Sequence, residues 1–374
     1  MLLTASLTLL ALFASIALTL AGQGAPVAVA HLVFAVGIVP LIFAAMLHFV
    51  PVLTRTGVPG LGLCILPSAA QIAGLLAVAA LQGWLPYWVL HPVALFDLLL
   101  ALVLLLWISV RARAALGGAH PGSRWYRAAL GCLLLALTAV LAMAIWPGQW
   151  PALRLMHLHL NTLGLVGLAA LGTLPVLLPT ACGRPDPAAG FWLRSWLWPA
   201  FAGVLLIALG SALHWTLSLA GSALLLAALL ALLRQWGRGF GLRRLVADGV
   251  TASLLAAAGG LALMILAGLM HGLGFLPARP ALLAWVFGFL LPLVSGALSQ
   301  LLPVWRWPGP QPPGRAAMRR KLAAGGGWRA AFFLIAAALA LAGFARLSTA
   351  FAAASMLLFA VALAQAIRVP RAKR

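Results

Sequence analysis

Acidic side chains are nearly missing from this chain of 374 residues, which has no glutamate and only three aspartates. Charged residues of both signs make up 7% of it, against about 25% in a soluble domain, so water cannot be its main solvent. The three cysteines show neither a CxxC pair nor another ligand spacing, so a disulfide framework or a zinc site is not expected. The shortage of carboxylates also disfavours a metal held by oxygen ligands.

Several enzyme classes are excluded by motifs that the chain lacks. It contains no Walker loop, Rossmann turn or Ser-His-Asp set, which argues against the chemistry of soluble enzymes. The short alternating segments of a β-barrel are also missing. The net charge of +21 could suggest nucleic acid, but the cations lie between apolar stretches rather than on one basic surface.

Apolar residues make up 65% of the chain and occur in long runs. A helix of about 20 such residues crosses the roughly 30 Å hydrocarbon core of a bilayer. The sequence therefore predicts an all-α polytopic membrane protein, one transmembrane domain over 1–374. Met1 to Gly22 is interpreted as the first span rather than a cleaved signal, because it lacks a basic n-region. Twelve helices are predicted, at 2–22, 28–52, 61–82, 87–110, 127–147, 153–179, 191–210, 212–233, 249–271, 281–304, 328–345 and 347–367.

The cations are distributed asymmetrically. Most Arg and Lys residues lie near loops that follow even-numbered helices, or in the tail after 367. The loops after odd-numbered helices carry only Arg154, Arg279 and Arg346. By the positive-inside rule, both termini are expected in the cytoplasm.

Three of the predicted helices resemble one another. The stretches 31–51, 159–179 and 283–303 end on Pro51, Pro179 and Pro303, which lie 128 and 124 residues apart. In this alignment small residues coincide at two positions, Gly164 with Gly288 and Gly172 with Gly296 and Ala44, as helices that pack closely in lipid require. Each stretch is the second of four helices, so we expect three four-helix units around a pseudo-threefold axis, with repeats at about 1–125, 126–247 and 248–374. The alternative is that all apolar helices look alike.

Most histidines are predicted to lie at one depth of the membrane, near its outer face. Ionisable residues inside a bilayer are costly and are functional candidates by default, and neutral imidazole is a usual ligand of haem iron and copper. A helix-bridging role is the alternative for any single one, but six at one depth favour a cofactor site. The six are His31, His91, His157, His159, His214 and His271.

The pair His157-Leu158-His159 is the most specific of these signals. Two residues apart on a helix correspond to about 200° of rotation, so the two imidazoles point to opposite sides. A regular helix cannot readily offer both to one metal. The pattern suits a helix wedged between two sites.

The stretch HLHLNTLGLVGLAALGTLPVLLPTACG at 157–183 resembles a helix of the catalytic subunit of haem-copper oxidases, in which an H-x-H pair divides two haems. The twelve helices in three groups of four resemble the same architecture. A closer likeness is to the NnrS family of haem- and copper-containing bacterial membrane proteins, linked to the nitric oxide response. It is carried by HLVFAVGIVPLIFAAMLHFVPVLTRTGVPG at 31–60.

This resemblance implies a location in the bacterial inner membrane and a function in handling nitric oxide or another diatomic ligand, or in electron transfer with a redox partner. It implies haem b between His31 and His159 as axial ligands, with His157 facing a second haem or metal. His91, His214 and His271 are then candidate ligands of that second metal, which could be copper.

The chain also departs from the oxidase pattern. The adjacent His-His pair of the copper site is missing, neither Tyr87 nor Tyr126 stands at a matching place, and no glutamate is present to carry protons. Asp97, midway along the fourth helix, is the one acidic residue placed for a membrane proton step, or for a hydrogen bond to a neighbouring helix. A proton-pumping terminal oxidase is therefore not expected, and whether the protein is an enzyme stays open.

Two other functions are compatible with the sequence. A transporter or metal/haem exporter with structural histidines would explain the prolines inside helices, Pro40, Pro175 and Pro292. An assembly or partner subunit without a cofactor is the third. Stable haem in the purified protein would favour the first interpretation.

Overall fold

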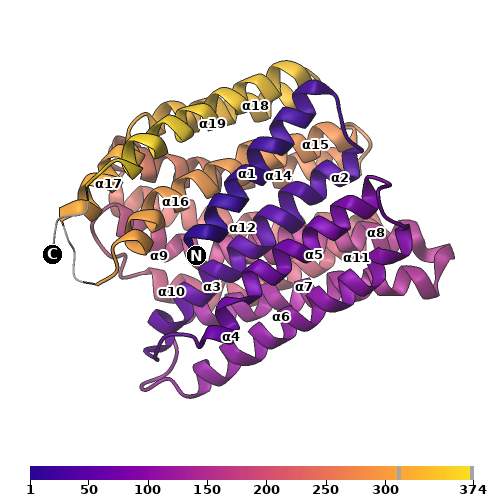
Figure 1. Cartoon of the computed structure of the whole chain (residues 1–374), viewed down its shortest axis with the longest axis horizontal. Helices are drawn as coiled ribbons and strands as arrows, with labels where there is room; N and C mark the ends of the chain where they lie inside the picture. Colours follow the sequence, from indigo (N-terminus) through magenta and orange to yellow (C-terminus); the bar gives the residue numbers. More distant parts are fainter. Residues whose placement is uncertain (310–312, 371–374) are drawn as a thin grey trace. The chain divides into compact units, whose positions relative to one another are not determined.

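The computed structural model describes residues 1–309 and 313–370, and over these ranges every regular element is helical (Figure 1). The elements are α1 (Leu2–Ala21), α2 (Pro26–His31), η1 (Leu32–Ile38), α3 (Val39–Thr54), α4 (Leu61–Cys64), α5 (Leu66–Leu81), η2 (Tyr87–Val89), α6 (Leu90–Arg113), α7 (Gly122–Ile145), η3 (Pro147–Gln149), α8 (Trp150–His159), η4 (Leu160–Gly167), α9 (Leu168–Ala181), α10 (Ala189–Ser195), α11 (Leu197–Ala212), α12 (Trp215–Phe240), α13 (Leu242–Ala247), α14 (Gly249–Gly272), α15 (Ala278–Trp285), η5 (Val286–Leu290), α16 (Leu291–Arg306), α17 (Pro313–Ala323), α18 (Gly326–Leu341) and α19 (Ala345–Ile367).

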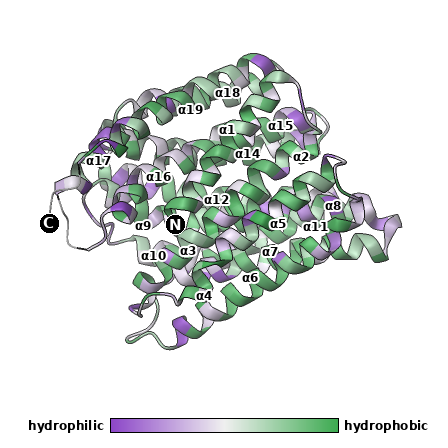
Figure 2. Cartoon of the chain, in the orientation of Figure 1, coloured by the Kyte–Doolittle hydropathy of each residue, from purple (hydrophilic) through white to green (hydrophobic). Residues whose placement is uncertain are grey.

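Eleven continuous helices in the described part of the chain are long and apolar enough to cross a membrane. The pair α10 and α11, bent by 45° at Trp196, gives a twelfth if the two cross as one span. The multi-pass membrane fold predicted from hydropathy is thus confirmed as eleven or twelve spans. Figure 2 shows hydrophobic residues along the helices and hydrophilic ones gathered near helix ends and in α17.

Helix boundaries differ most from the prediction where a more polar helix precedes the apolar run. The sixth span reaches from Pro147 to Ala181, because η3 and α8 extend the predicted 153–179 toward its N-terminus. The eleventh, predicted at 328–345, starts with the basic helix α17 and ends at Leu341. Three cations of the predicted tail, Arg371, Lys373 and Arg374, lie outside the described residues.

The chain forms two compact units. Apart from Leu2, unit 1 comprises residues 1–173 and 189–225, and unit 2 comprises residues 174–188 and those from 226 onward. In unit 1, α5, α6 and α7 are successive neighbours, and α7 also packs against η4. In unit 2, α14 contacts α16 and α18, and α18 pairs with α19. This division neither requires nor excludes the predicted three repeats.

The three resembling helices share a structural feature that hydropathy does not reveal. Each contains a π-helical stretch, namely η1, η4 and η5, and the described residues contain no other. Shifted by 128 and 252 residues, η4 and η5 both fall on η1. A π-helix strains the hydrogen-bond ladder and frequently marks a functional site, so its recurrence at one position supports the alignment of these helices.

A proline after two of these π-helical stretches leaves a backbone carbonyl without its partner in the same helix. Pro40 and Pro292 are equivalent in the alignment and cannot donate to the carbonyls of Val36 and Gly288, four residues earlier. In unit 1 the Val36 carbonyl accepts instead from Gln71 Nε2 on α5, at 3.4 Å. In unit 2 the Gly288 carbonyl faces the backbone of Gly260 on α14. The first freed carbonyl is therefore hydrogen-bonded by a neighbouring helix, and the second is packed against one.

Asp248 joins two helices of unit 2, α14 and the basic helix α17. Its Oδ1 accepts from the amides of Val250 (2.8 Å) and Thr251 (3.4 Å), which caps the N-terminus of α14. Arg319 of α17 forms a salt bridge to the same carboxylate at 3.1 Å and donates to Gln300 Oε1 at 2.7 Å. One carboxylate thus joins α14 to α17.

Replacing Asp248 by alanine is expected to lower the free energy of unfolding by about 0.5–2 kcal/mol, because the helix cap is lost. The salt bridge is partly exposed, with side-chain exposures of 24% and 34%, and adds little. Asp248→Ser, which keeps a capping oxygen but not the charge, should therefore stay close to wild type in a thermal unfolding assay in detergent. Equal losses in both variants would show that the ion pair matters more than the cap.

Candidate functional site: a pair of histidines in unit 1

Two of the predicted ligands, His31 and His157, lie opposite each other in unit 1. Their ring centroids are 6.3 Å apart and their planes differ by 9°. His31 ends α2 directly before η1, and His157 lies in α8, three residues before the start of η4. Both side chains are half-buried. Sequence stretches 126 residues apart are thereby brought together, each at the N-terminal side of a π-helical stretch.

The hydrogen bonds of these two rings fix where their protons lie. His31 Nδ1 is 2.8 Å from the carbonyl oxygen of Val27, and His157 Nδ1 is 3.0 Å from that of Ala136 on α7. A carbonyl oxygen can only accept, so Nδ1 carries the proton in both rings, and Nε2 of each neutral ring keeps a lone pair. Metal-binding histidines have this arrangement, because the carbonyl orients the ring and increases its basicity.

Asn161 supports His157 from the next turn of the same helix. Its Nδ2 donates to the His157 carbonyl oxygen at 2.8 Å and lies 3.5 Å from Nε2 of the ring. The bond to the carbonyl replaces part of the backbone ladder where the π-helical stretch η4 begins. Sequence reasoning missed this residue, although its position four residues after a predicted ligand places it on the same helix face.

His159, the predicted partner of His31, is oriented by its own helix. Its Nδ1 is 2.9 Å from the carbonyl oxygen of Leu155, one turn earlier, whereas His157 reaches the neighbouring helix α7. The arrangement favours His157 over His159 as the residue paired with His31. A role for His159 as an axial ligand stays a prediction.

The three histidines predicted for a second metal occupy separate environments. His91 Nδ1 is 3.2 Å from the Trp88 carbonyl oxygen in unit 1, and His271 Nδ1 is 2.6 Å from that of Leu276 in unit 2. His214 Nδ1 bonds to the Thr216 hydroxyl at 2.8 Å. The described residues contain no group of three or more His, Cys, Asp or Glu that could hold a metal ion.

Asp97, predicted for a proton step, is placed within the span formed by α6. Its Oδ1 is buried and has no hydrogen-bond partner among the described residues. One turn earlier, Val93 packs against Ala73 and Ala77 of α5. A buried carboxyl oxygen without a partner is costly, so this group differs from Asp186 and Asp248, whose oxygens accept hydrogen bonds.

His120 lies in the loop between α6 and α7 and is half-buried. Its Nδ1 accepts from the Gly122 amide at 3.2 Å, which requires a neutral ring. Burial, with the positive charge of Arg194 as a lesser cause, holds the pKa of His120 below its usual 6.5. This loop histidine is therefore part of the packing at the start of α7.

Acidification is expected to destabilise unit 1 through His120. The unfolded chain binds this proton at about pH 6.5 and the folded protein only at lower pH, so stability is complete above 6.5 and falls as pH drops below it. The thermal unfolding temperature should therefore drop less between pH 7.5 and pH 5.5 in His120→Gln than in wild type. The same drop in both would exclude this histidine as the cause.

The donor set of the pair suits haem iron or copper. Both metals bind neutral imidazole, and two Nε2 atoms from different helices are what a bis-histidine haem uses. Hard oxygen-binding cations are disfavoured because no carboxylate is among the partners of the pair. A scan against protein-family models finds no match for the chain, and a search of curated proteins finds no similar sequence.

Proposed function

We propose that this chain is a haem-binding protein of the bacterial inner membrane, similar to the NnrS family, with His31 and His157 as axial ligands of a b-type haem. The observation that carries the proposal is the parallel pair of imidazoles, each with its Nδ1 proton held by a backbone carbonyl. Bound haem would supply a redox-active iron for electron transfer. The ligand handled would be nitric oxide or another small diatomic molecule.

Copper is the second cofactor of the proposal. The predicted ligands His91, His214 and His271 are the candidate imidazoles for it, each with its own hydrogen bond that orients the ring. Asp97 is proposed to hold or pass a proton within the membrane, because its buried Oδ1 lacks a hydrogen-bond partner among the described residues. A proton-pumping oxidase remains unsupported, since the chain has no glutamate.

The proposed architecture is three four-helix units of the haem-copper oxidase kind, with both termini in the cytoplasm. The π-helical stretches at one register of the three resembling helices support the repeat. The accumulation of cations at the ends of even-numbered spans supports the orientation. Neither the proposed repeat nor the proposed orientation depends on a bound cofactor.

The test is an optical one. The protein would be purified in detergent from haem-replete, copper-supplemented cells, and reduced-minus-oxidised spectra would be recorded with metal analysis alongside. A Soret band with a sharp α-band is expected, with iron bound in stoichiometric amount. A colourless, metal-free but folded protein would contradict the proposal.

A transporter is the second candidate function, because the spans are interrupted as transport helices are. Two observations favour it, the π-helical breaks beside Pro40 and Pro292 and the 45° bend between α10 and α11. It would move to first place if the purified protein were folded and free of haem.

A further inference from the structure

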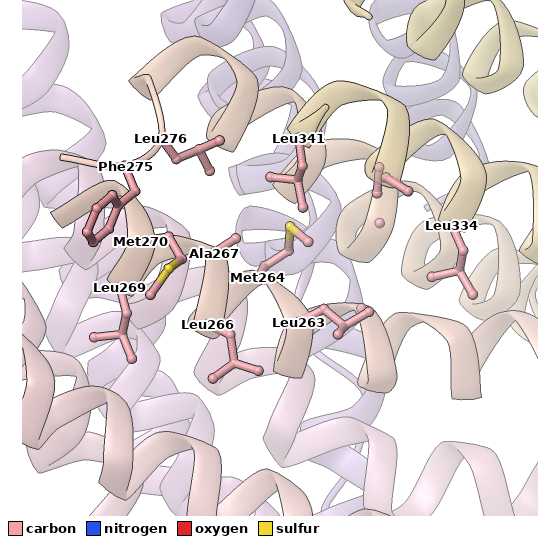
Figure 3. Close-up of a pocket in the computed structure, with 14 residues that line it drawn as sticks. Leu263, Met264, Leu266, Ala267, Leu269, Met270, Phe275, Leu276, Leu334 and Leu341 are labelled. Atoms are coloured by element: carbon pink, nitrogen blue, oxygen red, sulfur yellow. The ribbon is translucent and has the colours of Figure 1, made fainter. Parts of the chain in front are cut away.

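Unit 2 contains a cavity of about 660 Å³ between α14, η5 and α18 (Figure 3). Its volume lies within the range of small-molecule sites, about 300–1,000 Å³. All of its lining residues are Gly, Ala, Leu, Met or Phe, so no side chain could hydrogen-bond a polar ligand. The cavity is therefore suited to an apolar, flexible occupant, for which methionine surfaces such as those of Met264 and Met270 adapt readily.

The cavity is open on the side where its rim residues are exposed. Leu263, Leu266 and Met270 of α14 are 44–55% exposed, and Phe275 is 76% exposed, whereas Met264 is buried. These rim residues belong to or adjoin a membrane-spanning helix, where the surrounding medium is lipid. The occupant can therefore enter from the bilayer.

The third of the resembling helices contributes one residue, Gly288, to the wall of the cavity. Gly288 of η5 and Gly260 of α14 both line it, and their backbones are in contact. In the alignment, Leu283 takes the place of His31 and His159. This helix thus keeps the π-helical stretch but offers an apolar cavity instead of an imidazole.

Two arginines follow the residues at one end of the cavity. Leu276 and Leu341 line this end, where α14 and α18 terminate (Figure 3). Arg279 comes three residues after Leu276, Arg346 comes five after Leu341, and both are exposed. The opposite ends of the unit 2 helices carry the other cations from 249 to 370. Arg279 and Arg346 are therefore the only described positive charges of that stretch at the end where the cavity opens to lipid.

We propose that this cavity binds one acyl chain of a phospholipid whose phosphate is held by Arg279 and Arg346. The apolar lining selects the chain, because a polar ligand would lose its hydrogen bonds to water without replacement. The two arginines select the phosphate headgroup, to which guanidinium groups bind by charge-assisted hydrogen bonds. The site is independent of the histidine pair and of haem.

The test uses the full-length protein in phosphatidylcholine vesicles doped with phosphatidylglycerol that carries a diazirine midway along one acyl chain. After illumination, peptide mass spectrometry locates the adducts. They are expected on cavity residues such as Met264 and Ala267. Ala338→Phe adds a ring at an exposed lining position and so fills part of the space for the acyl chain. We expect about tenfold fewer adducts, which corresponds to a tenfold weaker binding of the lipid.

Controls separate occupancy from folding and from general lipid contact. Ala14→Phe places the same ring on an exposed helix position of α1 outside the cavity and should leave the adducts unchanged. Replacing each arginine by glutamine should lower labelling about fivefold, as expected for about 1 kcal/mol per cation near a lipid phosphate. A diazirine diacylglycerol, which lacks phosphate, should label the cavity weakly in every variant.

Three outcomes would overturn the proposal. Adducts spread evenly over exposed residues of α19, such as Leu357 and Val361, would indicate general lipid contact only. Equal labelling in Ala338→Phe and wild type would show that the chain does not occupy the cavity. Equal labelling by diacylglycerol and phosphatidylglycerol would remove the role of the two arginines. A thermal unfolding curve is recorded for each variant, so that labelling is compared only between folded proteins.

Discussion

The His157→Ala variant is expected to lose the haem spectrum, with the Soret and α-bands falling to background. Loss of groups that only orient a ligand costs about 10–100-fold in metal affinity, so loss of a ligand itself should cost more than about 100-fold. His31→Ala should have the same effect, because its ring lies parallel to that of His157 at 6.3 Å. Reduced-minus-oxidised spectra and iron content of the purified variants measure the change.

Two further variants make this result specific. His120 lies in the loop between α6 and α7 and is not one of the predicted ligands. The His120→Ala variant should therefore retain the full spectrum, and it serves as a control for the removal of an imidazole. His159→Ala discriminates between the ligand pair favoured by the structure and the one implied by the family resemblance. If His159→Ala loses the bis-histidine spectrum and His157→Ala keeps it, the pair His31 and His157 is wrong.

Replacing Gly260 by alanine is expected to destabilise unit 2 by about 1–3 kcal/mol, which is typical of overpacking in a tight core. A Cβ at this position would lie 2.6 Å from the carbonyl carbon of Gly288 and closer still to its oxygen. Backbone cannot move aside as a flexible side chain can, so α14 and η5 would have to separate. The thermal unfolding temperature in detergent should therefore fall.

The adjacent glycine is a matched control for this substitution. A Cβ at Gly259 meets no atom within 4 Å, and it lies in the same helix at the neighbouring position. Gly259→Ala should stabilise α14 by about 0.5–1 kcal/mol, because glycine loses more conformational entropy on folding than alanine. If both variants shifted stability in the same direction, close packing at Gly260 would not be its cause.

The π-helical stretches connect these two predictions. His31 and His159 directly precede η1 and η4, and Gly288 lies within η5. In each case the π-helical stretch packs closely against a neighbouring helix, through Gln71, Cys132 or Gly260. We infer that the π-helical stretch positions an imidazole in two of the helices and lines an apolar cavity in the third.

Hydropathy determined the membrane character and most of the spans of this protein. Burying a long apolar run is enforced by the lipid solvent, whatever the partners of the helix, so composition and run length suffice. The likeness of helices 31–51, 159–179 and 283–303, which share a π-helical stretch, was also recognisable, because proline and glycine act on the backbone locally. The bend at Trp196 was not, since the predicted helix 191–210 runs across it and neither glycine nor proline marks position 196.

Which histidines face each other was decided by the tertiary structure alone. The spacing of His157 and His159 shows that they point to opposite sides of a helix, but not which of them faces His31. That depends on how α8 is rotated against α2 and α7, which is set by packing and by the bond from His157 to Ala136. Likewise, Gly259 and Gly260 are indistinguishable in the sequence, and only contact with Gly288 makes one of them indispensable. A sequence pattern reports periodicity along one helix, whereas a binding site requires the rotation and distance of several.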